Sequence, residues 1–262
     1  MEISLFYCHP VEPFRSKAST GSSLNRCWSV DQHRFCFDGV GLPSFAFSGS
    51  RDAQTPVFAS GMTRQGEDMS RIAYINGRYV PQARAMVAME DRGYQFADGV
   101  YEVVSLYGGR FIDADGHLAR LERSLAALNI AMPMQLASLE KVMHELIRRN
   151  RRRNGLIYIQ VTRGVATRNH ISKPAKPVLS LSINPVKYPS GQDIAQGAAV
   201  ITLPDQRWAR CDIKSIALLP NVLARREAAD AGAREAWQIK DGVITEGSLS
   251  NAYIVKDRTI IT

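Results

Sequence analysis

The stretch EDRGYQFADGVYEVVSLY, from Glu90 to Tyr107, begins as a polar, glycine-spaced segment and ends as a run of β-branched and aromatic residues. The second part, from Val100 onward, predicts a strand, because such side chains pack well on a pleated surface. The first part is too long for a plain hairpin turn, and loops of this kind often carry function. Taken alone, such a segment is more often a solvated connection than a functional loop. Its role must therefore be judged from the rest of the chain.

Outward from this stretch, strands and helices alternate from residue 70 to the end. Asn76-Gly77 is the strongest short hairpin signal, because both positions of its turn need a positive φ. Leucines recur at helical spacing over 118–128, and a second apolar stripe covers 139–147. Further predicted elements are strands at 72–75, 78–80, 110–112, 156–162, 178–183, 198–203, 233–240, 243–246 and 253–255, and a helix at 221–231. The chain is therefore predicted to begin with an antiparallel hairpin and to end in a strand-rich part.

Length and composition describe a globular protein of about two domains, since 262 residues are shared among domains of roughly 150. Apolar residues make up 45% and charged residues 22%, which is typical of folded chains. No apolar run approaches the ~20 residues of a membrane helix. The net charge of +8 could indicate nucleic-acid binding, but positive and negative residues are interspersed along the chain. The dense run Arg148–Arg153 lies at the C-terminal end of a predicted helix, where positive charges interact favourably with the helix dipole. We therefore expect neither a membrane nor a nucleic acid as partner.

The composition shifts near residue 69. Residues 1–68 hold three of the four cysteines and seven of the nine phenylalanines without sustained periodicity, and we expect a poorly ordered extension or an artefact of start-site choice. Those cysteines lack metal-ligand spacing, so no metal site is predicted. Glu2 and the early Pro10 do not fit a secretory signal, which favours a cytoplasmic protein. The remaining chain is divided into an N-terminal α+β domain, an interdomain linker and the start of a C-terminal domain, at 69–187, 188–196 and 197–262.

The commonest nucleotide, metal and serine-hydrolase motifs do not occur in the sequence. There is no Gly-x-Gly-x-x-Gly, no phosphate-loop consensus, no paired-cysteine zinc spacing and no Gly-x-Ser-x-Gly elbow. A less generic candidate is Lys214, which follows Ile213 in the charged and aromatic segment Arg207–Ser215. Taken alone, a lysine in this setting is usually a surface residue, because lysines are rarely buried.

Several motifs in one order resemble those of the fold-type IV pyridoxal-phosphate enzymes, and most closely the D-amino-acid aminotransferases. The resemblance runs nearly continuously from Tyr74 to Ile261 and leaves out residues 1–68. Its densest parts are 90–104, 117–121, 160–164 with the following Arg-x-His, 207–215 and 245–251. It implies a two-domain α+β aminotransferase that acts as a homodimer. The implied cofactor is pyridoxal 5'-phosphate, and the implied substrates are a D-amino acid and a 2-oxo acid such as pyruvate or 2-oxoglutarate.

The same resemblance assigns cofactor-binding roles. Lys214 matches the lysine that forms the aldimine with the cofactor and then moves a proton at the substrate Cα. Glu246 matches the carboxylate that pairs with the ring nitrogen, although in isolation it is a turn carboxylate after a hairpin. Arg120 matches the arginine that holds the phosphate, although in isolation it is a solvated helix residue. Ser250 and Asn251 follow in the cofactor-binding segment.

Three further residues match those that bind the substrate carboxylate in this family. They are Tyr101, Arg168 and His170, and the last two are expected to reach in from the partner subunit. An Arg-x-His spacing places two donors on the same side of an extended loop. The pair separates this interpretation from a branched-chain L-amino-acid aminotransferase, which is not expected to carry it. That enzyme, an aminodeoxychorismate lyase of the same fold and a catalytically silent fragment remain the alternatives.

The chain departs from the family pattern at two places. Leu249 stands where the family has a serine, so a polar contact near the cofactor is replaced by an apolar one. The Gly-Ile-Thr segment at a helix start, which completes the phosphate cup of the family, would follow Thr262. We therefore expect a C-terminally truncated fragment of an active enzyme that binds the cofactor weakly or not at all.

Overall fold

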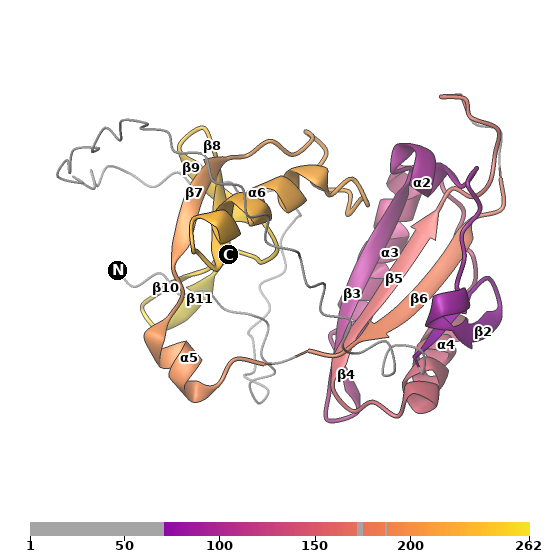
Figure 1. The fold of residues 1–262 in the computed structure, drawn as a ribbon, viewed down its shortest axis with the longest axis horizontal. Coiled ribbons are helices and arrows are strands. Elements are labelled where there is room, and N and C mark those ends of the chain that lie inside the picture. Colours follow the sequence, from indigo (N-terminus) through magenta and orange to yellow (C-terminus); the bar gives the residue numbers. More distant parts are fainter. Residues whose placement is uncertain (1–70, 172–174, 187) are drawn as a thin grey trace, which may run out of the picture.

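A six-stranded antiparallel sheet forms the first part of the structure (Figure 1). The computed structural model describes residues 71–171, 175–186 and 188–262, so the expectation for residues 1–68 lies outside the described residues. The strands are β1 (Ile72–Ile75), β2 (Arg78–Pro81), β3 (Gly99–Tyr107), β4 (Arg110–Ile112), β5 (Gly155–Thr162) and β6 (Val178–Asn184). Their order in the sheet is β2-β1-β6-β5-β3-β4.

The hairpin predicted at Asn76-Gly77 is confirmed. Both residues have positive φ, 46° and 89°, and Ile75 lies opposite Arg78 in the register of β1 and β2. The Asn76 side chain accepts a hydrogen bond of 2.9 Å from the backbone N–H of Leu179 in β6. The turn therefore also fastens the hairpin to the next strand of the sheet.

Two amphipathic helices, α3 (Ala114–Ala127) and α4 (Leu136–Asn150), pack against the sheet. The predicted apolar stripes are confirmed, because buried side chains of both helices share one core with the even-numbered residues of β3. The core includes Val100, Val104, Leu106, Leu118, Leu121, Leu125, Leu139, Met143, Leu146, Ile157 and Ile159. The arginine run ends α4 as expected, with Arg148 and Arg149 paired to Glu145 at the surface.

Three short helical elements were missed by the sequence analysis. One is the 3-10 helix η1 (Gln82–Arg84), and another is α2 (Arg92–Phe96), which lies inside the segment interpreted as a loop. Asp91 caps α2 by accepting a 2.8 Å hydrogen bond from the backbone N–H of Gly93. The third, α5 (Gly191–Gln196), lies inside the predicted linker, where Ser190 and Asp193 form a capping box.

The second sheet consists of β7 (Val200–Pro204), β8 (Glu235–Lys240) and β9 (Val243–Gly247), in that order. β7 and β8 are parallel and are connected by α6 (Leu219–Asp230), whereas β8 and β9 are antiparallel. Small residues form its core, with Ala224, Ala228, Ala233 and Ala236 packed against Ile201 and Leu203. A separate hairpin of β10 (Ile254–Lys256) and β11 (Thr259–Ile261) follows. No described helix is long and apolar enough to cross a membrane.

A short antiparallel contact joins the segment before α6 to the start of β3. β4 pairs with β3 only over Ser105–Tyr107, so the first residues of β3 keep a free edge. There the backbone N–H of Tyr101 donates to the Lys214 carbonyl at 3.0 Å, and the N–H of Ile216 donates to the Gly99 carbonyl at 3.1 Å. The backbone of Lys214 is therefore held against the sheet.

Two features fix this contact. The side chain of Ile213 is buried in the core of the first sheet, so the segment is anchored by apolar burial as well as by hydrogen bonds. Gly99 is closely packed on both sides, because a Cβ at this position would lie 2.7 Å from the Val161 carbonyl oxygen in β5 and 3.1 Å from Ile216 Cδ1. A larger residue at position 99 would push the backbones apart.

We predict that Leu121→Ala lowers the free energy of unfolding by about 2–5 kcal/mol, because it leaves a cavity in the larger core. Leu121 is 0% exposed, whereas Leu219, which is 67% exposed, provides a matched leucine. Leu219→Ala is expected to change stability by less than about 0.5 kcal/mol. Urea denaturation measures both values, and equal losses would contradict the assignment of the core.

Candidate functional site

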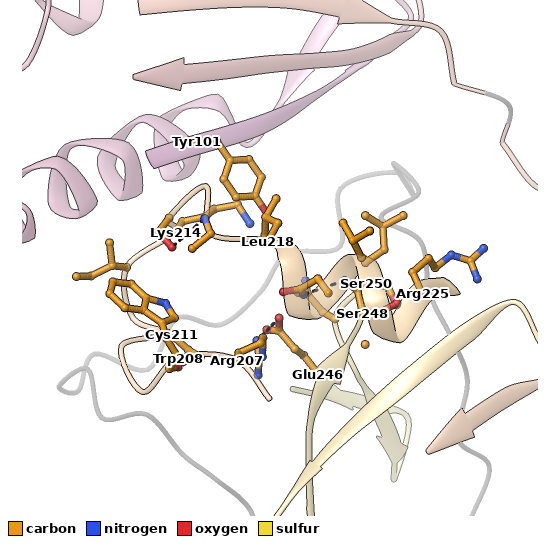
Figure 2. A pocket seen from close by; sticks show the side chains of 18 of the residues that line it. Tyr101, Arg207, Trp208, Cys211, Lys214, Leu218, Arg225, Glu246, Ser248 and Ser250 are labelled. Atoms are coloured by element: carbon orange, nitrogen blue, oxygen red, sulfur yellow. Dashed lines mark hydrogen bonds and ion pairs between the residues drawn. The ribbon is translucent and has the colours of Figure 1, made fainter. Parts of the chain in front are cut away.

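A cleft of about 390 Å³ lies between the start of β3, the segment before α6 and the loop after β9 (Figure 2). Six residues that the sequence analysis singled out line it together: Tyr101, Arg120, Lys214, Glu246, Ser250 and Asn251. Two others, Arg168 and His170, are not among its lining residues. The cleft thus collects an amine, a carboxylate, a guanidinium group and hydroxyl groups from segments that are distant in sequence.

Lys214 lies beside Tyr101 on one side of the cleft (Figure 2). Its Nζ is 4.5 Å from the centroid of the Tyr101 ring, a distance at which an aromatic face attracts an ammonium group. Behind this ring, Tyr158 stacks at 5.5 Å with an interplanar angle of 25°, and burial raises the pKa of Tyr158 to about 12. The backbone N–H of Lys214 also donates to Ser124 Oγ at 3.3 Å. Lys214 is therefore a positioned, partly buried residue.

Glu246 lies on the other side of the cleft, beside Arg207 (Figure 2). Nη1 of Arg207 pairs with Glu246, while its Nε and Nη2 donate to the two Asp205 oxygens at 2.9 and 2.7 Å. These hydrogen bonds lower the pKa of Asp205 to about 2. Arg207 lies in the segment that carries the resemblance, but its pairing with Asp205 was not predicted from the sequence. The Asp-x-Arg spacing was the one local signal for this pair.

The loop from Ser248 to Ser250 is organised by Glu235, a buried carboxylate that the sequence analysis missed. The hydroxyl and backbone N–H of Ser248 donate to its Oε1, and the Ser250 hydroxyl donates to its Oε2 at 2.8 Å. The backbone N–H of Leu249 adds a fourth bond, of 3.2 Å. Burial opposes ionisation here, yet the hydrogen bonds, led by that of Ser248, lower the pKa of Glu235 below its usual value. Asn251 lies beyond this loop and donates to the Tyr253 hydroxyl at 3.0 Å.

Arg120 is held at the cleft by Glu102, whose carboxylate is 0% exposed. Nε of Arg120 donates to Oε1 at 2.5 Å and Nη2 donates to Oε2 at 2.8 Å, while His117 Nδ1 lies 2.8 Å from Oε2. Burial opposes the charge of Glu102, but the hydrogen bonds from Arg120 and His117 lower its pKa. Because the carboxylate uses Nε and Nη2, the Nη1 group of Arg120 is left for an anion in the cleft.

Arg168 and His170 lie on the α2 side of the first sheet. Their side chains surround Phe96, with the Arg168 Cζ 4.7 Å and the His170 ring 5.4 Å from the centroid of its ring. Arg92, which is buried, donates to the carbonyls of Asn169 and His170 at 2.5 and 3.4 Å. The structure thus fixes this loop on α2, and the prediction that it reaches a partner's cleft stays a prediction.

The residues of the cleft fit pyridoxal phosphate. That molecule carries an anionic phosphate, a protonatable ring nitrogen and an aldehyde, and the cleft offers Arg120, Glu246 and Lys214 for these three groups. The volume lies in the range of small-molecule pockets. Among the described residues no group of three or more His, Cys, Asp or Glu side chains could hold a metal ion.

Comparison with known proteins gives a consistent picture. The family described as Amino-transferase class IV matches residues 99–262. The chain is 43% identical over 188 residues to a D-alanine aminotransferase of Bacillus licheniformis, a match that covers 71% of this chain and 66% of that protein. The chain therefore spans slightly less than two thirds of this relative's length.

Solved structures show the same fold. The branched-chain amino acid aminotransferase of Escherichia coli superposes with a TM-score of 0.63 at 20% identity, over 73% of this chain and 65% of that one. The 4-amino-4-deoxychorismate lyase of Pseudomonas aeruginosa superposes with a TM-score of 0.58 at 28% identity, over 72% and 68%. The expected fold class is thereby confirmed.

We predict that Glu102→Gln destabilises the protein by about 1–3 kcal/mol at pH 7, because it removes charged hydrogen bonds to Arg120 and His117. The pKa of Glu102 is lower in the folded protein than its unfolded value of about 4.3. Its contribution is therefore complete above that value and is lost as the pH falls through the folded pKa. Urea denaturation between pH 7 and pH 3 should show the difference between the two proteins shrinking.

Glu145→Gln provides the control, because Glu145 pairs with Arg148 and Arg149 at the surface, where ion pairs contribute little. Its stability should stay close to that of the unmodified protein. A destabilisation by Glu102→Gln that is the same at every pH would mean that the charge of Glu102 is not what stabilises the fold.

Proposed function

Because the chain belongs to the class IV aminotransferase family, we propose that it transfers amino groups between D-amino acids and 2-oxo acids, such as pyruvate or 2-oxoglutarate, with pyridoxal phosphate as cofactor. The observation that carries the proposal is the cleft in which Lys214 and Tyr101 face the pair of Glu246 and Arg207. The identity to a D-alanine aminotransferase supports the D-amino acid as substrate class.

Five residues would hold the cofactor. Nζ of Lys214 would bind its aldehyde carbon, Nη1 of Arg120 its phosphate and the carboxylate of Glu246 its ring nitrogen. Ser250 and Asn251 would complete the wall around it. In this arrangement Glu102 and Glu235 do not touch the cofactor, but they hold Arg120 and the serine loop in place. Preorganised groups of this kind lose little freedom when a ligand binds.

The bound cofactor supplies an electron-withdrawing ring that stabilises the charge left when the substrate Cα loses its proton. Lys214 removes this proton with its Nζ and holds it for the return step. The face of the Tyr101 ring stabilises the resulting ammonium group through a cation–π contact. Glu246 balances the positive charge of the protonated ring nitrogen. Each role uses a side chain that already lines the cleft.

In a homodimer, the residues that bind the substrate carboxylate would come together from two chains. Tyr101 lines the cleft of its own chain, whereas Arg168 and His170 lie on α2 and would enter the partner's cleft. Ile171, the residue after His170, is an apolar side chain that is 85% exposed, and a partner subunit would cover it. We propose a cytoplasmic homodimer on these grounds and on the sequence analysis.

Two enzymatic alternatives share the fold, a branched-chain aminotransferase and an aminodeoxychorismate lyase. A catalytically silent fragment, which would bind the cofactor weakly or not at all as expected from the sequence, is the alternative from another class. The cleft, in which Lys214, Glu246 and Arg120 are already gathered, favours an active chain. The Arg168-x-His170 pair favours D-amino acids over the branched-chain substrates. Turnover of D-alanine, L-leucine and aminodeoxychorismate discriminates among the enzymes, and preference for L-leucine would replace our proposal by the branched-chain one.

We predict that Lys214→Ala keeps the fold but loses the absorption band of bound pyridoxal phosphate and at least ~10²–10⁴-fold in turnover of D-alanine. Lys256→Ala, on the exposed side of β10, is the matched control and should keep both. Circular dichroism checks the fold of both proteins. A Lys214→Ala protein with the normal band and turnover would reject the assignment.

We predict that Arg168→Ala weakens capture of D-alanine by about 10- to 100-fold, because the substrate carboxylate loses one charged hydrogen bond. When chains with Arg168→Ala and chains with Lys214→Ala are coexpressed, half of the dimers contain one chain of each kind. One of the two sites in each mixed dimer then has an intact Lys214 from one chain and an intact Arg168 from the other. About a quarter of the wild-type activity should therefore return. If Arg168 serves its own chain, the mixed population shows no such recovery.

A further inference from the structure

Arg207 lies between two carboxylates at the edge of the cleft. Its side chain is 12% exposed, and that of Asp205 is 6% exposed. Nε and Nη2 of Arg207 bind Asp205 in a two-pronged arrangement, while Nη1 pairs with Glu246. Thr245, the neighbour of Glu246 in β9, donates its hydroxyl to Asp205 at 2.8 Å. The guanidinium group therefore connects the end of β7 to β9 and touches the proposed partner of the ring nitrogen.

The charges of this cluster do not cancel. Asp205 and Glu246 carry two negative charges and Arg207 carries one positive charge, so one negative charge is left over. Asp205 is nearly buried and has its oxygens bound by Arg207 and Thr245, whereas Glu246 is 39% exposed and lines the cleft. Of the two carboxylates that Arg207 binds, Glu246 is thus the one that faces the cleft.

We propose that Arg207 is a positioning residue that holds the carboxylate of Glu246 aimed at the ring nitrogen of the cofactor. The inference rests on the proposed function and adds a residue to it. An arginine suits this task because it stays charged at every physiological pH and its planar fork can bind Asp205 with two donors and Glu246 with a third. Without it, the two neighbouring carboxylates would repel each other, and Glu246 would lose the contact that fixes its direction.

A purely structural role makes a different prediction. If Arg207 only fastens β7 to β9, its loss would weaken binding of any ligand of the cleft. If it acts through Glu246, its loss affects ligands with a ring nitrogen and spares those without one. Measuring the binding of one ligand with a ring nitrogen and one without it therefore separates the two roles.

The test measures dissociation constants by quenching of tryptophan fluorescence, for which Trp208 in the cleft wall is a natural reporter. The probes are pyridoxal phosphate and its 1-deaza analogue, in which a C–H group replaces the ring nitrogen. Arg207→Met should bind pyridoxal phosphate at least about tenfold more weakly and the analogue within about twofold of the unmodified chain. Arg210→Met is the matched control, since Arg210 pairs with Asp212 at the surface, and it should change neither constant.

A double-mutant cycle gives the second readout. Because Arg207 acts through Glu246, adding Arg207→Met to Glu246→Gln should weaken pyridoxal phosphate binding by no more than about twofold further. Arg207→Lys keeps the positive charge but not the planar guanidinium group, so its dissociation constant for pyridoxal phosphate should lie between those of the unmodified protein and Arg207→Met. It replaces Arg207→Met in the test if that variant does not fold. Equal losses for both probes, or losses that multiply in the double variant, would overturn the inference.

The dissociation constants, together with the turnover of D-alanine, separate this inference from the proposed function. An unmodified chain that binds neither probe overturns both. A chain that binds pyridoxal phosphate but turns over no D-alanine overturns the proposed function alone, because the role of Arg207 is judged by the dissociation constants.

Discussion

The site depends on one short backbone pairing, in which Lys214 and Ile216 are hydrogen-bonded to the start of β3. β4 covers only the far end of β3, and the free edge that it leaves accepts the segment that leads into α6. Ile213 anchors the segment in the core of the first sheet, and Gly99 packs closely between β5 and Ile216. Because the pairing fixes main-chain atoms, the Lys214 amine is kept beside Tyr101 although the two residues belong to distant parts of the sequence. Glu246 and the loop from Ser248 to Ser250, which line the cleft with them, belong to the second sheet and the segment after it.

Ion pairs and hydrogen bonds to carboxylates hold the other groups of the cleft. Glu102 holds Arg120, Asp205 holds Arg207 beside Glu246, and Glu235 holds the loop from Ser248 to Ser250. In each case a buried or nearly buried carboxylate fixes a group that lines the cleft. Replacing a whole buried ion pair by apolar side chains is often neutral, because removing charges from water is costly, whereas removing one partner alone leaves a buried charge and is destabilising. The benefit of such pairs is geometric, since groups that are already oriented need no rearrangement when charge develops during a reaction.

Much of the fold and part of the site could be predicted from the sequence. Elements with local signals were found, such as the Asn76-Gly77 hairpin and the apolar stripes of α3 and α4. The short helices α2 and α5 were missed because each has fewer than seven residues and depends on a capping side chain, Asp91 or Ser190. The resemblance selected Lys214, Glu246, Arg120 and Tyr101, which the structure brings into one cleft. It could not select Glu102 or Glu235, because their partners are set by strand register and helix packing, which leave little trace in local sequence. Arg207 has a local partner in Asp205, but its contact with Glu246 depends on the fold.

The central claim is that the cleft places the Lys214 amine to bind the aldehyde of pyridoxal phosphate. The most direct measurement is to incubate the chain with the cofactor, reduce it with borohydride and locate the phosphopyridoxyl group by peptide mass spectrometry. Our account predicts that the group is attached to Lys214. Attachment to a different lysine, such as Lys240 or Lys256, or no attachment at all, would contradict it.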